Sequence, residues 1–413
     1  MQRLPRTVWL LVLARAVNRL GAFSFSFLTV LATTGFGASA ATAGCVSAGF
    51  GLATIPSRLA GGRLADRLGR RRTIVLGLVG CALAQLGIAA AGGLAWLAVF
   101  AVLLGLAFEL YEPPSQAMIA DAVPPAQRPR AFSLLSAALA AAGMAAGLIA
   151  AALGRWDLRL LFVVDAATCL LCALVVRLVL PADTPRTPDS GRLRPGPGPD
   201  RPPSAVPVAA WRDRALLAVL ASGTGFAVLY TLVLTVLPLV VADRGMPPAD
   251  AGLLFTVSAL TTVAGQPLLR RGPLPALSGP RALALGFTLF ALGLAGCAPA
   301  HSPAAFIAPT VAWSLGDLLL MGRLYAAAAD LAPPGATGRY LAVFGTSWGV
   351  AAVVAPLAGT QLLQHLGAAA LWTVAATAAL LLAALQPLLA RATARQRPPR
   401  PVPSPEADAV PNS

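Results

Sequence analysis

The chain has 413 residues, of which 57% are hydrophobic and only 11% are charged. Soluble domains carry roughly 25% charged residues, so this composition excludes an ordinary soluble protein and indicates a membrane protein. The formal net charge is +15 and every basic residue is arginine. Because most arginines fall between apolar runs, this charge reflects membrane topology and does not indicate nucleic-acid binding.

Long apolar segments dominate the chain. A membrane-spanning helix needs about 20 apolar residues, and twelve segments meet that requirement, which predicts an all-α membrane protein with twelve transmembrane helices. The predicted helices cover residues 8–32, 41–62, 73–92, 95–119, 131–153, 158–180, 215–241, 250–269, 281–298, 304–329, 340–364 and 368–390.

A segment rich in Pro, Arg and Asp separates the sixth predicted helix from the seventh, and a similar composition follows the last one. Such segments cannot bury enough apolar surface to fold. We therefore predict an N-terminal six-helix bundle (1–181), a cytoplasmic linker (182–214), a C-terminal six-helix bundle (215–391) and a disordered cytoplasmic tail (392–413).

The distribution of arginine predicts the orientation in the membrane. If the N-terminus, the linker and the C-terminus lie in the cytoplasm, only Arg155, Arg159 and Arg244 fall on the outer side. An excess of arginine on the cytoplasmic side is what orients insertion. We expect a multi-pass protein of the bacterial inner (plasma) membrane, with both termini in the cytoplasm.

The two halves of the chain repeat each other. Residues 121–130 (DAVPPAQRPR) recur as residues 330–339 (DLAPPGATGR), a shift of 209 residues (339 − 130). The same shift maps Arg72 on Arg281, Gly77 on Gly286 and Gly87 on Gly296. Parallel repeats of this kind place the ligand site near the membrane midplane, between the halves.

The basic segment from Gly62 to Arg72 follows the pattern Gly-x-x-x-Asp-Arg-x-Gly-Arg-Arg, and we predict a cytoplasmic loop here. It is similar to the loop between helices 2 and 3 of the major facilitator superfamily of transporters. The matching positions are Gly62, Asp66, Arg67, Gly69, Arg70 and Arg71. With the repeat and the twelve spans, the chain resembles this superfamily over residues 1–395. The resemblance implies a cytoplasmic gate in which the loop arginines hold Asp66, and Asp121 is a natural acid for Arg67 or Arg70.

A narrower resemblance lies at Glu112-Pro-Pro-Ser-Gln-Ala and at residues 124–134 (PPAQRPRAFSL). Both stretches look like the fourth and fifth helices of MdtH-type bacterial multidrug efflux proteins. The fifth helix departs from drug antiporters, because small residues such as Gly143 and Gly147 are not followed by a Gly-Pro pair. The departure bears on the direction of transport and leaves the fold prediction unchanged.

Charged residues inside apolar spans are costly and usually functional or paired. In the first half these are Arg15 and Arg19, with Asn18 between them, and Glu109 and Glu112. At 1.5 Å per residue, Arg15 and Glu112 lie roughly 13 Å deep and Arg19 and Glu109 roughly 18–20 Å deep. We predict the ion pairs Arg15–Glu112 and Arg19–Glu109. Either they only lock two helices together, or one glutamate exchanges a proton.

In the second half, Asp317 is close to the repeat counterpart of Glu109 and is a further candidate for proton coupling; the alternative is a structural ion pair. It shares a helix face with Trp313, four residues earlier. Phe23, Tyr230 and Trp348 join Trp313 as candidate cavity residues, although aromatic residues more often serve packing. Arg58 and Asp165 have no predicted partner.

These features predict a secondary active transporter that works by alternating access and exports small, partly apolar compounds against proton entry. The alternatives are proton-coupled uptake of an anionic metabolite held by Arg15 and Arg19, and a transport-dead sensor or scaffold. The chain has no phosphate-binding Gly-x-x-x-x-Gly-Lys loop and no His cluster, so we expect neither enzyme activity, nor a metal, nor a cofactor beyond the proton gradient. The expected partners are a small molecule and the lipid bilayer, without nucleic acid, around a monomer.

Overall fold

The computed structural model describes residues 5–21, 24–111, 114–115, 118–119, 122–124, 128–179, 210–269, 277–333 and 336–394. Regular structure within these ranges is helical throughout. The N-terminal half contains α1 (Arg6–Gly21), η1 (Ser24–Phe27), α2 (Leu28–Val30), η2 (Leu31–Gly35), α3 (Ala40–Leu68), α4 (Arg70–Ala89), α5 (Leu94–Phe108), α7 (Arg128–Leu153) and α8 (Arg159–Val179). The C-terminal half contains η4 (Ala210–Arg212), α9 (Arg214–Asp243), α10 (Asp250–Gly265), η5 (Gln266–Leu269), α11 (Gly279–Cys297), α12 (Pro303–Asp330) and α13 (Thr337–Ala394).

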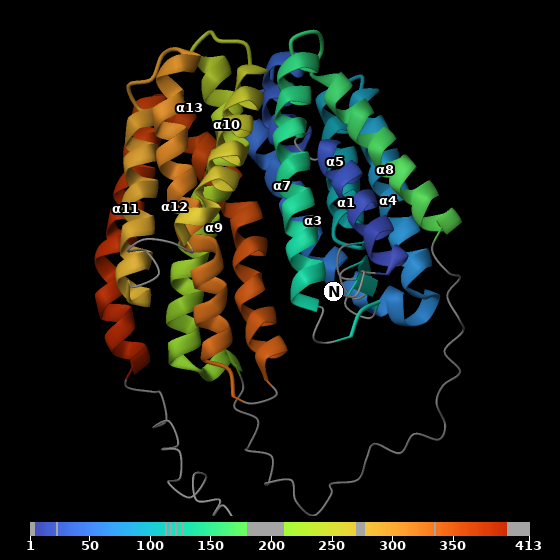
Figure 1. Cartoon of the computed structure of the whole chain (residues 1–413). Coiled ribbons are helices and arrows are strands. Elements are labelled where there is room, and N and C mark those ends of the chain that lie inside the picture. Colours follow the sequence, from blue (N-terminus) through green and yellow to red (C-terminus); the bar gives the residue numbers. More distant parts are fainter. Residues whose placement is uncertain are drawn as a thin grey trace, which may run out of the picture.

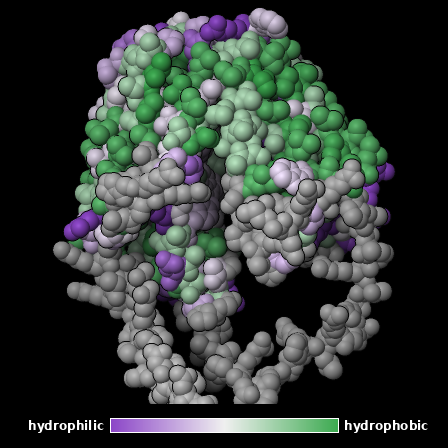
Figure 2. Space-filling view, in the orientation of Figure 1, coloured by the Kyte–Doolittle hydropathy of each residue, from purple (hydrophilic) through white to green (hydrophobic). Residues whose placement is uncertain are grey.

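The helices form two bundles, α1–α8 and α9–α13 (Figure 1), and each bundle has its own apolar core. Leu11, Leu78 and Phe162 are fully buried in the first core, and Phe290 and Trp372 in the second. On the face shown in Figure 2, a broad apolar surface lies below polar residues at the upper end. The predicted class, an all-α membrane protein of two pseudo-symmetric bundles, is confirmed.

Seven helical spans among the described residues are long and apolar enough to cross a membrane. The last of them is interrupted at Gly367, whose φ of 79° divides α13 into two helices. A backbone with positive φ favours glycine, because other residues place Cβ against a carbonyl oxygen there. The count of twelve stays a prediction.

Helix boundaries reproduce the repeat seen in the sequence. Helices α4, α5 and α7 match α11, α12 and α13, because 279 − 70, 303 − 94 and 337 − 128 all give 209. Packing repeats as well: a Cβ at Gly77 would lie 3.1 Å from the Leu110 Cβ, and one at Gly286 would lie 3.2 Å from the Leu319 Cβ. The two halves are therefore two versions of one structure.

The basic segment 62–72 is mostly helical, so the predicted loop is wrong in extent. Helix α3 continues to Leu68 and α4 begins at Arg70. Gly69 alone lies between them, with a φ of 92°. Arginine is a good helix former, and its long side chain reaches water from the end of a helix, so the chain needs only one glycine to turn.

The fourth predicted span, 95–119, is broken near its middle. Helix α5 ends at Phe108, and Glu109 follows with φ −90° and ψ −4°. Pro113 and Pro114 have no N–H to bond the carbonyls of Glu109 and Leu110, and a proline ring clashes with the carbonyl four residues earlier. The break places Glu109 at the end of a helix instead of within one.

The two bundles meet closely at one end. We call the end at which α8 finishes and α9 starts the linker end, and the opposite one the far end. Helix α3 packs on α13, α7 packs on α10, and η1 and α2 pack on α9. At the far end, Thr29 Oγ1 donates to the Thr235 carbonyl (2.9 Å) and the Ala41 N–H donates to Gln364 (2.8 Å). The bundles diverge toward the linker end (Figure 1).

The three arginines predicted for the outer side all lie at the far end. Two of them cap helices: Arg159 Nη1 donates to the carbonyl of Ala89, the last residue of α4, and Arg244 donates to the carbonyls of Cys297 and Ala298 at the end of α11. Burial lowers the pKa of the Arg244 guanidinium. Cations suit the C-terminal ends of helices, so these two residues stabilise the far end.

The third arginine, Arg155, forms an ion pair with Asp250 across the two halves (2.9 Å). The Arg155 side chain is 56% exposed, and exposed pairs contribute only about 0.2–1 kcal/mol. We therefore expect Asp250→Asn to raise the population open at the far end by about 1.4- to 5-fold. Spin labels at exposed Trp156 and Pro247 in a Cys45→Ala background measure this as a longer distance. An unchanged distance distribution would show that this pair does not hold the far end closed.

Candidate functional site

In the N-terminal half, an ion pair joins Glu109, at the end of α5, to Arg58 on α3. Arg58, on α3, donates through Nε to Glu109 Oε2 (3.2 Å) and through Nη2 to Oε1 (3.4 Å). The Glu109 N–H donates to Ser57 Oγ (3.1 Å). Two parallel N–H···O bonds make this pair directional as well as charged.

Arg58 also reaches the other half, because its Nη1 donates to the Gly345 carbonyl on α13 (3.4 Å). The Glu109 side chain is 15% exposed and the Arg58 side chain 48%. One guanidinium therefore joins a carboxylate of the first bundle to the backbone of the second.

The structure pairs Glu109 with Arg58, a partner that the sequence did not predict, and the pair Arg19–Glu109 stays a prediction. Helix α5 ends at Phe108, just before this carboxylate. Glu112, the partner predicted for Arg15, lies outside the described residues, so that pair stays a prediction.

Arg15, Asn18 and Arg19 line one pocket of about 310 Å³, which we call the arginine pocket. Its other lining residues are Phe108, Tyr111, Leu139 and Ala140. The Arg15 guanidinium lies 5.4 Å from the centre of the Tyr111 ring, close enough for a cation–π interaction. The pocket thus combines two cations, an amide and aromatic surface.

The C-terminal half presents an aromatic cluster. The Tyr230 ring lies 5.7 Å from Trp348 and 6.0 Å from Phe226. Trp348 Nε1 donates to the Tyr325 hydroxyl (2.9 Å). Edge-to-face geometry such as the 88° between Tyr230 and Trp348 is the arrangement that aromatic rings favour.

Asp317 lies near this cluster, on α12. Its Oδ1 atom is buried and has no hydrogen-bond partner among the described residues. Trp313, one turn away, is in the core against Phe290 (6.2 Å), so it is a packing residue more than a cavity wall. Tyr230 is close enough to both Asp317 and Arg19 for their charges to act on its hydroxyl.

The structure describes only part of the predicted gate. Gly62 and Asp66 belong to α3 and Gly69 is the turn, while Asp121 lies outside the described residues, as does the cavity candidate Phe23. Arg67 is exposed at the linker end. Arg71 donates from Nη2 to the Arg177 carbonyl near the end of α8. The latch between Asp66, Asp121 and the arginines stays a prediction.

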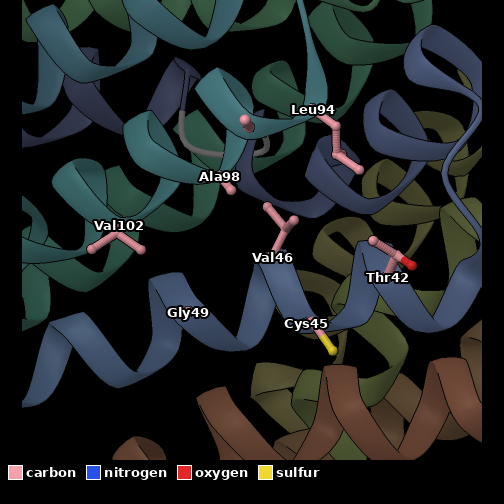
Figure 3. A pocket seen from close by; sticks show the side chains of 8 residues that line it. Thr42, Cys45, Val46, Gly49, Leu94, Ala98 and Val102 are labelled. Carbon is pink, nitrogen blue, oxygen red and sulfur yellow. The ribbon is translucent and has the colours of Figure 1, made fainter.

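A separate groove of about 430 Å³ lies between α3 and α5 (Figure 3). Small and apolar residues line it, among them Cys45, Val46, Ala98 and Val102. It has no charged side chain and does not lie between the halves, so we place the candidate site at the arginine pocket and the aromatic cluster.

Comparison with known families decides the class of protein. The sequence profile of the Major Facilitator Superfamily matches residues 11–272 and again 227–412. The chain belongs to the Major Facilitator Superfamily. The first match runs through the N-terminal half and on through α10, and the second begins within α9.

Curated relatives support this membership. The chain is 27% identical to the uncharacterized MFS-type transporter YhjO of Bacillus subtilis over 314 residues, covering 75% of this chain and 74% of that protein. It is 32% identical over 208 residues to the multidrug resistance protein MdtH of Cronobacter sakazakii, which covers 49% of this chain and 48% of that one. The match to MdtH thus spans about half of each protein.

Solved transporter structures share the superfamily fold. The POT family transporter PepTSo superimposes with a TM-score of 0.77 at 15% identity, covering 96% of this chain and 100% of that one. A bacterial homologue of the human lysosomal transporter Spinster, in an inward-facing and unoccupied conformation, gives a TM-score of 0.74 at 16% identity, covering 96% and 98%. At these identities the likeness shows the fold alone.

Proposed function

We propose that this protein is a secondary active transporter that works by alternating access and exports small, partly apolar compounds in exchange for protons. The observation that carries the proposal is the Arg58 guanidinium, which joins Glu109 of one half to the Gly345 carbonyl of the other. A proton on a membrane-embedded carboxylate can therefore change a contact between the two halves that must move.

The proposed step begins with ionised Glu109 holding Arg58 through two charge-assisted hydrogen bonds. A proton added to this carboxylate removes its charge and weakens both bonds. The Arg58 side chain is then no longer held by Glu109, its contact with the Gly345 carbonyl of the other half changes, and the halves rearrange. When the proton leaves Glu109, the pair forms again and the original arrangement is restored.

The substrate class follows from the walls of the site. The C-terminal half contributes aromatic rings from α9 and α13 and Asp317, whose Oδ1 has no hydrogen-bond partner among the described residues, and Tyr230 is within electrostatic range of Arg19 in the arginine pocket. Aromatic surface suits flat, partly apolar compounds. Similarity to MdtH, which is named as a multidrug resistance protein, supports export as the direction. In this proposal Asp317 is a second candidate for proton or cation binding.

Uptake of an anionic metabolite is the second candidate function, and the arginine pocket favours it. Arg15 and Arg19 both have other interaction partners, so an anion would have to displace them. Arg67, Arg70 and Arg71, with Asp66 and Asp121, would close the linker end in either direction of transport. We further propose that the protein works as a monomer in the bacterial plasma membrane with both termini in the cytoplasm.

The test is transport by purified protein in liposomes with an imposed pH gradient. Ethidium represents lipophilic cations, and a panel of small carboxylates represents anionic metabolites. We expect gradient-driven movement of a lipophilic compound against proton flow, at least about tenfold above liposomes without protein. Carboxylate movement with protons would favour uptake, and movement of neither class at any pH would contradict transport.

A further inference from the structure

A buried carboxylate lies behind the arginine pocket, in a position that the proposed mechanism does not use. Asp165, on α8, is 5% exposed. Ser24 Oγ donates to its Oδ2 (2.5 Å), and Cys169 Sγ donates to its Oδ1 (3.8 Å). Helix α1 crosses α8 here so closely that a Cβ at Gly21 would lie 2.4 Å from the Asp165 Cα.

A chain of polar contacts joins this carboxylate to the pocket. Asn18 Nδ2 donates to Cys169 Sγ (3.1 Å), and the Tyr111 hydroxyl donates to Asn18 Oδ1 (3.0 Å). Both Tyr111 and Asn18 line the arginine pocket. Every donor in this chain points from the pocket toward Asp165, so the chain is ordered for an ionised carboxylate.

The surroundings of Asp165 do not supply a charged partner. Within the described part of the chain no ion pair involves it. The groups that act electrostatically on Asp165 or on the cysteines around it are Arg15 on α1, Cys81 on α4, and Cys169 and Cys172 on α8. Of these, Arg15 acts electrostatically on Cys172. A buried carboxylate without a cation is costly in its charged form.

Gln85 can bond both forms of Asp165. It is 3% exposed, and its side-chain amide is a hydrogen-bonding neighbour that favours the ionised carboxylate. Its Oε1 is buried and has no hydrogen-bond partner in the described residues. An ionised carboxylate can offer that oxygen nothing, whereas a carboxylic acid has one O–H to donate. Ser24 and Cys169 both donate hydrogen bonds to Asp165. Because a metal ion needs many oxygen ligands, this site suits a proton better than a metal ion.

We propose that Asp165 is a second proton-carrying residue of this transporter, linked through Cys169, Asn18 and Tyr111 to the occupancy of the arginine pocket. One proton converts the carboxylate to the acid, whose O–H donates to Gln85 Oε1. Loss of this proton restores the chain of hydrogen bonds that runs from Tyr111 to Asp165. A ligand that engages Tyr111 or Asn18 changes the donors that reach Asp165. The use of this proton in transport rests on the proposed function, whereas the titration of Asp165 does not.

Infrared difference spectroscopy of the full chain in lipid, recorded while pH is varied without any ligand, tests the titration. We expect the wild-type protein to show the carbonyl band of a buried carboxylic acid that disappears as pH rises. Asp165→Asn, which keeps the size and most hydrogen bonds, should lose this band and keep its melting temperature. Glu109→Gln should keep the band. If Asp165→Asn loses none of the titrating carbonyl bands of the wild type, those of Glu109 and Asp317 included, or if the wild type shows no titrating band, the proposal is overturned.

Two further variants test the link between Asp165 and the arginine pocket. They also serve in place of Asp165→Asn if that variant fails to fold. Tyr111→Phe removes one hydrogen bond at the pocket end of the chain, and Ser24→Ala removes one at the carboxylate. Each should move the midpoint of the band by about 0.5 pH unit or more. A midpoint unmoved by Tyr111→Phe would overturn the link to the pocket. If the wild-type protein shows no gradient-driven transport, the proposed function is rejected, and the assignment of the band to Asp165 still holds.

Discussion

Replacing Glu109 by Gln should reduce transport driven by a pH gradient at least about tenfold. The amide keeps the shape of the side chain but cannot titrate. Of the two charge-assisted hydrogen bonds from Arg58, it keeps at most the one to its oxygen, in weaker form, because its NH2 group cannot accept the other. Hydrogen bonds to charged groups contribute about 1.5–3 kcal/mol, and about 1.4 kcal/mol is a factor of ten in an equilibrium. The measurement is initial transport rate in liposomes at several imposed gradients.

Exchange of labelled for unlabelled compound without a gradient is the internal control. Exchange needs the halves to move but no net proton transfer, so Glu109→Gln should retain it. Asp243→Asn removes a carboxylate that is exposed at the far end and should change neither rate. If Glu109→Gln keeps the full gradient-driven rate, this carboxylate does not couple transport to protons.

Replacing Gly51 by Ala should reduce transport about tenfold by preventing close approach of the two halves. A Cβ at Gly51 would lie 2.2 Å from the Ala352 carbonyl oxygen on α13, a distance that real Cβ atoms do not reach without a backbone shift. Overpacking of this kind costs about 1–3 kcal/mol. The cost falls only on states in which α3 and α13 touch, so the variant should favour opening at the far end.

Gly49 provides a matched control on the same helix. A Cβ there would lie 3.4 Å from the nearest atom, Val102 Cγ2 within the N-terminal half, which is close to ordinary contact. Gly49→Ala should therefore transport within about twofold of the wild type. Equal rates in Gly49→Ala and Gly51→Ala would show that the α3–α13 contact does not limit the cycle.

The arrangement of the helices was predictable because it follows from apolar length, arginine placement and the 209-residue shift. The shift places Arg70 and Gly279, and Leu94 and Pro303, at equivalent helix starts. Two local features were missed for definable reasons. Apolar length predicts one helix over residues 95–119, but Pro113 and Pro114 oppose a continuous helix. The charge after Gly62 predicts a loop, but arginine has a high helix propensity.

The site was predictable only in part. Arg15, Asn18 and Arg19 share a helix face, and they do line one pocket. The partner of Glu109 was missed because only the first and fourth predicted helices were paired; Arg58 is roughly 15 Å from Leu68 along α3, a depth similar to that of Glu109. The surroundings of Asp165 leave no pattern in the sequence, because Ser24, Gln85 and Cys169 come from three separate segments.

The central claim is that protonation of Glu109 controls a contact between the two halves. Spin labels at the linker end of α3 and α13, in a Cys45→Ala background, report the distance between the halves as pH is varied. We predict that the distance distribution of the wild type changes with pH, and that Glu109→Gln shows one distribution at every pH. A Glu109→Gln protein whose distances follow pH as the wild type does would contradict the account.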